Sequence, residues 1–154
     1  MIRAALCLLA LAAPAAARSV GPCGDWTRAE ALAEPWEQFS ATYASGALRL
    51  AVLDSAEPAA AAVHLLILSP PYDEANDRQC RVVSLNEAQA DGWPIGFFDM
   101  DFAARVADYD PVSGLVVTIP AQTFVPETGG GAPAALTVTI DQQSGAISAE
   151  LAPG

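Results

Sequence analysis

The sequence contains no lysine, a single histidine and only three cysteines among its 154 residues. Its basic side chains are therefore seven arginines, set against eighteen acidic residues, and the formal net charge is −11. Such a charge argues against partners held by phosphate contacts or by anionic lipid headgroups. We expect no nucleic-acid partner, and we attribute the acidity to the solubility of an exported protein.

The scarcity of histidine restricts the catalytic schemes open to the chain. A Ser-His-Asp or Cys-His scheme, or a zinc site with the usual ligands, would have to use His64. This residue lies inside the apolar run Ala62–Ser69, and the chain has no Gly-x-Ser-x-Gly motif. We expect His64 to be packed and hydrogen-bonded within a sheet.

The longest apolar stretch at the N-terminus is too short to span a membrane. Arg3, the run Ala4–Ala13 and then Ala15-Ala16-Ala17 are typical of a secretory signal peptide, whereas a spanning helix needs ~20 apolar residues. We predict a signal peptide over residues 1–17, with Arg18 or Ser19 as the new N-terminus. The rest, residues 18–154, is one domain without a membrane span, periplasmic or secreted.

Removal of the signal peptide removes Cys7 and leaves two cysteines. An even number in an exported chain predicts a disulfide between Cys23 and Cys80. Because it closes a long loop, the chain-entropy model assigns it roughly 4 kcal/mol.

The C-terminal third repeats one turn pattern three times between apolar runs. In each turn a bulky residue is followed by a turn opener, then Ser or Thr, then Gly, and the glycines are Gly114, Gly129 and Gly145. The glycine supplies the positive φ that lets the next strand continue in register. The pattern predicts a β-meander of about four strands.

Residues that alternate between apolar and polar predict further strands upstream. One short helix is expected first, from Thr27 to about Glu34, because Thr27 and Glu30 fit a capping box and Pro35 ends it. Strands are then expected around residues 39–43, 48–52, 62–69, 79–83 and 96–102, and we extend the last to Tyr109. The predicted fold is all-β: an antiparallel β-sandwich or, alternatively, a closed up-and-down β-barrel.

One loop collects oxygen ligands. Asp73, Glu74, Asn76 and Asp77 follow the central apolar strand, and calcium prefers such oxygen donors. The Asp-x-Asp-x-Asp-Gly order of a helix-loop-helix calcium site is missing. Calcium binding and simple loop solubility are both open, and the sequence indicates no cofactor.

The densest aromatic segment begins at Trp93, after a polar loop from Asn86 to Gly92. Phe98 shares the strand face of Met100 and should be in the core, whereas Trp93 and Phe97 lie off that face. Trp93 either covers an open end of the fold or, with Phe97, lines the mouth of a binding site.

Two functions of different classes remain. The first is a non-catalytic binding or envelope-structural domain whose partner is an unknown protein or a small apolar ligand. The second is an envelope hydrolase that uses paired carboxylates, because Asp99 and Asp101 would share one strand face about 7 Å apart. An enzyme should gather titratable groups in one pocket, whereas a binding domain should show an apolar cleft.

Overall fold

The computed structural model of the chain describes residues 15–87 and 92–154. Most of the predicted signal peptide, residues 1–14, and the centre of the loop predicted between Asn86 and Gly92 lie outside the described residues. Within the described ranges, no helix is both long and apolar enough to cross a membrane.

The described residues form strands connected by short turns and brief helices. The strands are β1 (Ala16–Ala17), β2 (Ser19–Pro22), β3 (Ser40–Tyr43), β4 (Leu48–Asp54), β5 (Val63–Tyr72), β6 (Arg78–Ser84), β7 (Asp99–Met100), β8 (Val106–Asp110), β9 (Gly114–Val125), β10 (Gly130–Ile140) and β11 (Ile147–Pro153). The helical segments are the α-helix α1 (Trp36–Phe39) and the 3-10 helices η1 (Ala29–Ala31), η2 (Ala44–Gly46) and η3 (Phe102–Ala104).

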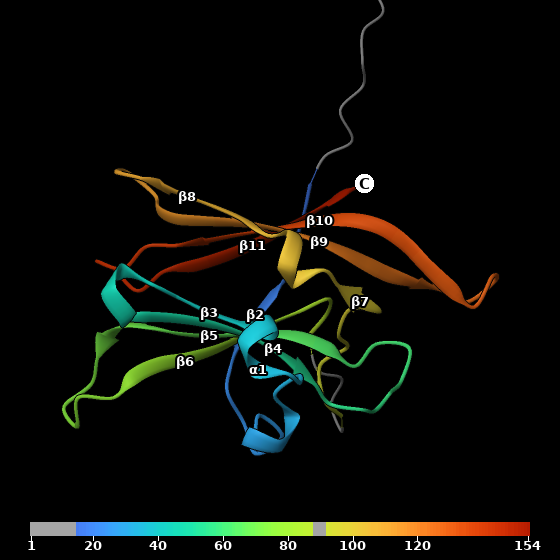
Figure 1. Cartoon of the computed structure of the whole chain (residues 1–154), viewed down its shortest axis with the longest axis horizontal. Coiled ribbons are helices and arrows are strands. Elements are labelled where there is room, and N and C mark those ends of the chain that lie inside the picture. The colour runs from blue at the N-terminus through green and yellow to red at the C-terminus, as the bar shows by residue number, and fades with distance from the viewer. Residues whose placement is uncertain (1–14, 88–91) are drawn as a thin grey trace, which may run out of the picture.

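The strands form two antiparallel sheets that pack face to face (Figure 1). Sheet A has six strands in the order β1-β11-β10-β9-β7, and β8 also pairs with β9. Sheet B has five strands in the order β2-β6-β5-β4-β3. The sandwich is therefore the correct one of the two predicted folds.

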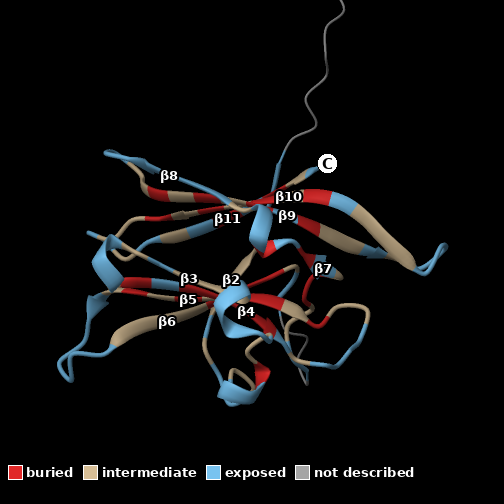
Figure 2. Ribbon diagram, viewed as in Figure 1, coloured by how far each residue is buried: buried red, intermediate tan, exposed pale blue. Residues whose placement is uncertain are grey.

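The hydrophobic core lies between the two sheets, where Figure 2 shows the buried positions. In β10 every second residue from Ala134 to Ile140 is buried, as expected for a strand with one face on a core. Leu65 and Ile67 of the central strand β5 are fully buried on the facing side. The predicted alternation in these strands is confirmed.

The C-terminal meander is confirmed. Strands β8, β9, β10 and β11 pair in sequence order, and each connection closes with a predicted glycine in the left-handed region, with φ of 92° at Gly114, 67° at Gly129 and 78° at Gly145. The turn openers also act as predicted: the N–H groups of Ser113 and Val112 donate to Asp110, and those bonds lower the pKa of its carboxyl.

The predicted N-terminal helix is only partly formed. Instead of a helix from Thr27 to Glu34, the structure has η1, and the α-helix α1 begins after Pro35. The capping box is wrong, because the Thr27 hydroxyl donates to the carbonyl of Gly24, 2.7 Å away. The chain leaves helical geometry at Leu32, which pairs with Leu53 of β4. Pairing with a distant strand thus overrides the local preference.

The predicted strand from Gly96 to Phe102 contains only the two residues of β7. Before β7 the Phe97 N–H donates to the Val63 carbonyl in sheet B, and the Phe98 N–H then donates to Gln122 in sheet A. This change of sheet reverses the expected alternation, so Phe97 is fully buried and Phe98 is only half-buried. The strand predicted up to Tyr109 is correct from Val106 onward, after η3.

Candidate functional site

The outer face of sheet B is apolar. On the side that points away from the core, β4 carries Ala51 and Leu53, and β5 carries Leu66 and Leu68. Ala51 and Leu53 are buried, whereas Leu66 and Leu68 are half-buried. A sheet with apolar residues on both faces needs a further layer to cover it.

The N-terminal segment 23–39 supplies this layer. The predicted disulfide is present: Cys23 is bonded to Cys80 of β6, with a Cα–Cα distance of 5.5 Å and a separation of 57 residues. Trp26, Leu32 and Leu66 then pack against a second, smaller cluster of buried residues, which are Ala31, Leu53 and Val82. A disulfide is typical of proteins in oxidising, extracellular compartments.

His64 lies beneath this layer. Its Nδ1 is 2.9 Å from the Ser84 Oγ, and the Trp26 ring covers it with 4.8 Å between ring centroids. Burial lowers its pKa from 6.5 to about 4, against an opposing effect of the Asp54 carboxylate. His64 is therefore a packed and hydrogen-bonded residue, as expected, and it is 1% exposed.

The cover is incomplete at its C-terminal end, where α1 lies beside β3 and β4. There an apolar hollow of about 170 Å³ opens between α1 and the outer face of sheet B. We call it the Trp36 hollow, and its lining residues are Leu32, Ala33, Trp36, Phe39, Ser40, Arg49, Ala51, Val52, Leu66 and Leu68.

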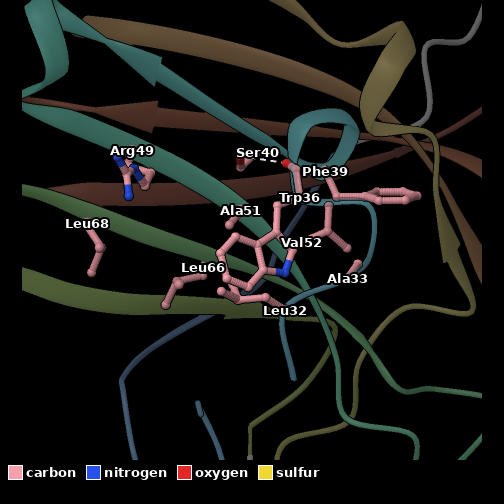
Figure 3. Close-up of a pocket in the computed structure, with 10 residues that line it drawn as sticks. All are labelled: Leu32, Ala33, Trp36, Phe39, Ser40, Arg49, Ala51, Val52, Leu66 and Leu68. Carbon is pink, nitrogen blue, oxygen red and sulfur yellow. Dashed lines mark hydrogen bonds between the residues drawn. The ribbon is translucent and has the colours of Figure 1, made fainter. Parts of the chain in front are cut away.

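Trp36 is the dominant feature of the hollow. Its side chain remains 57% exposed, although most tryptophans in folded proteins are largely covered. Figure 3 shows its indole beside Leu32 and Leu66, with Arg49 and Leu68 at the other end. The Ser40 hydroxyl donates to the Trp36 carbonyl at 2.7 Å and so holds the end of α1 in place. An exposed tryptophan over an apolar depression is typical of a binding surface.

The aromatic residues predicted as a binding site are separated by the structure. Phe97 is a fully buried core residue, so it lines no surface. Trp93 is 54% exposed and stacks on Trp26 with 6.3 Å between ring centroids. Trp93 therefore extends the aromatic cluster around Trp26, and its binding role stays a prediction.

The predicted calcium ligands form a hairpin turn between β5 and β6. Asp73 Oδ1 accepts the N–H groups of Ala75 and Asp77, each at 2.9 Å, and Asn76 adopts a positive φ of 66°. In the part of the chain that the structure describes, no three His, Cys, Asp or Glu side chains converge as a metal site would require. Calcium binding by Asp73, Glu74, Asn76 and Asp77 stays a prediction without geometric support.

The two carboxylates of the hydrolase alternative have local partners. Asp99 Oδ1 accepts the N–H of Met100 at 2.8 Å, and Asp101 Oδ1 accepts the N–H of Ala104 at 3.1 Å at the start of η3. Asp101 follows β7 rather than lying in it, so the pair does not share a continuous strand face. These bonds give both residues a local structural role, and a hydrolase that uses them stays a prediction.

The sequence interpretation missed the Trp36 hollow. Its one available signal was that Leu66 and Leu68 alternate with an equally apolar set in the same strand, which requires a cover on both sides.

Comparison with known proteins adds no relative. No protein-family model, no curated protein sequence and no solved structure matches the chain. The function must be inferred from the geometry of the site.

Proposed function

We propose that the protein is an exported, non-catalytic binding domain, periplasmic or secreted, in which the Trp36 hollow receives an apolar side chain of a partner protein. The observation that carries the proposal is the 57% exposed indole of Trp36 above an apolar depression. Exposed aromatic residues of this kind are enriched among those that contribute most to protein–protein binding.

The size of the hollow favours a side chain over a whole small molecule. Its volume is about 170 Å³, whereas pockets for drug-sized ligands measure about 300–1,000 Å³. A hollow of this size accommodates an anchor residue such as leucine or phenylalanine.

A positive charge at one end of the hollow orients the partner. Arg49 lies at the end near Leu68, where its guanidinium can bind a carboxylate or a carbonyl oxygen of the partner. The hollow therefore favours a bound segment that carries such an acceptor beside its apolar side chain.

The export part of the proposal rests on the predicted signal peptide and on the disulfide between Cys23 and Cys80. N-terminal sequencing of the protein recovered from the periplasm or the medium should find Arg18 or Ser19 as the first residue. A membrane-bound product that begins at Met1 would contradict this part alone.

The binding part can be tested with blocked amino acids as probes. We expect N-acetyl-leucinamide and N-acetyl-phenylalaninamide to shift the NMR signals of the Trp36 indole N–H and of the Leu66 and Leu68 methyl groups. Burial of one such side chain contributes about 1.5–3 kcal/mol, so the dissociation constant should be about 10 mM or weaker. N-acetyl-serinamide should leave the signals unchanged.

Two matched variants make this test specific. Trp36→Ala should abolish the shifts of Leu66 and Leu68, because it removes one wall of the hollow. Trp93→Ala removes a tryptophan of similar exposure elsewhere on the surface and should leave them intact. Equal shifts with the leucine and serine probes, or shifts that survive in Trp36→Ala, would refute the proposed site.

A further inference from the structure

Strand β8 is exposed along its whole length. All five of its residues are exposed, and Figure 2 shows the strand as a continuous exposed ribbon at the edge of sheet A. Val106 and Tyr109 are 68% and 60% exposed, and Val112 in the following turn is 93% exposed. Val106 and Tyr109 point to opposite faces of the strand, so this edge presents apolar surface on both sides.

The backbone of β8 has a free edge. β8 pairs with β9 from Val106↔Thr118 to Asp110↔Gly114, and within residues 15–87 and 92–154 no strand pairs with its other edge. In an antiparallel pair, alternate residues direct their N–H and C=O groups away from the partner strand. These groups can accept another strand.

The carboxylate of Asp108 occupies one hydrogen-bond donor of this edge. The Tyr109 N–H donates to Asp108 Oδ1 at 2.9 Å, so the donor that an added strand would need is already occupied. Asp110, two residues further on, adds a second negative charge to the same strand. A lysine or arginine opposite Asp108 can bind its carboxylate and release the Tyr109 N–H, whereas an acidic strand would be repelled by the same carboxylate.

We propose that the free edge of β8 binds an extended segment of another protein, which joins sheet A as an additional strand. In this segment apolar residues alternate with lysine or arginine. The apolar residues would pack beside Ala107 and Tyr109 on one face of the strand, and the basic residues would bind Asp108 and Asp110 on the other. A second copy of this chain does not fit this description, because its β8 is acidic and its net charge is −11. This surface is separate from the Trp36 hollow and does not depend on it.

The test uses two synthetic peptides, one with valine alternating with lysine and the other with glutamate in place of lysine. We expect the lysine peptide to bind and to shift the Tyr109 amide signal, and the glutamate peptide to bind at least about tenfold more weakly. In Asp108→Ala, which lacks this carboxylate, the affinities for the two peptides should approach each other. Asp99→Ala removes the similar carboxylate bond in β7 and should leave the preference unchanged.

A third variant separates strand addition from simple charge attraction. Ala107→Pro should remove binding of the lysine peptide, because proline at an edge position deletes an outward N–H while the fold tolerates it. Circular dichroism checks that the variant is folded. Binding that survives Ala107→Pro, equal affinity for both peptides, or a doubling of the mass of the protein alone with concentration would overturn the proposal.

Discussion

The two sheets differ in how their outer faces are covered. Sheet A exposes polar groups there, such as Thr118 and Thr137, whose hydroxyl oxygens are 3.2 Å apart. Sheet B carries apolar residues on its outer face. A third layer, the segment 23–39, covers them and is linked to the sheet by a disulfide. The Trp36 hollow lies where this third layer does not cover the sheet, so an apolar surface remains there for a partner.

Removal of the disulfide, which links the third layer to sheet B, should cause the largest loss of unfolding free energy. In the chain-entropy model a loop of 57 residues gives a stabilisation of about 4 kcal/mol. We expect Cys23→Ser with Cys80→Ser to lower the free energy of unfolding in urea by about this amount. An unchanged unfolding midpoint would show that the third layer is held without the covalent bond.

Removal of the central cover residue should have the next largest effect. Trp26→Ala deletes the ring that packs on His64 and on the smaller buried cluster, so we expect a loss of about 3 kcal/mol in unfolding free energy. Trp36→Ala, at the uncovered end of the same layer, should cost less than about 1 kcal/mol because its side chain is largely exposed. Equal losses would mean that the two ends of the layer do not differ.

The loss of unfolding free energy on acidification, which arises from His64 in sheet B, should be smaller still. The pKa of His64 is lowered to about 4 in the folded protein, so between pH 6.5 and 4 the unfolded chain binds more protons than the folded one. Stability should therefore fall as the pH is lowered, by about 2 kcal/mol between roughly pH 7.5 and pH 5. Urea unfolding at the two pH values measures this, and His64→Asn should lack that part of the dependence.

The smallest effect is expected on the outer face of sheet A. Thr137→Ala removes one partner of the Thr118 contact, and such cross-strand pairs contribute roughly 0.2–1 kcal/mol. We expect the unfolding free energy to fall by less than about 1 kcal/mol. A loss as large as that in Trp26→Ala would contradict the view that this face needs no cover.

The parts of the fold that could be predicted are those governed by local sequence. The turns at Gly114, Gly129 and Gly145 specify the meander, because turn residues and alternating strands act over a few positions. The disulfide followed from the count of cysteines. The helix predicted from Thr27 failed because Leu32 pairs with Leu53, a contact that no local pattern reveals.

The candidate site was less predictable than the fold for the same physical reason. The burial of Phe97 depends on its backbone pairing with Val63 at the end of β5, a distant contact that no local pattern shows, so its place in the core could not be predicted. The exposure of Trp36 depends on how far the segment 23–39 extends over sheet B. An apolar strand such as β5 predicts that a cover exists, but the gap in that cover is visible only in three dimensions.

The crossing from Phe97 to Asp99 has a consequence for hydrogen exchange. Phe97 is bonded to sheet B and Asp99 pairs with sheet A two residues later, so neither sheet can move away from the other at this point without breaking backbone bonds. Asp99 pairs near one end of β9, and the turn to β8 lies at the other. Slow opening of the sandwich should therefore begin at the β8 end, and the Phe97 amide should exchange only when the whole molecule unfolds.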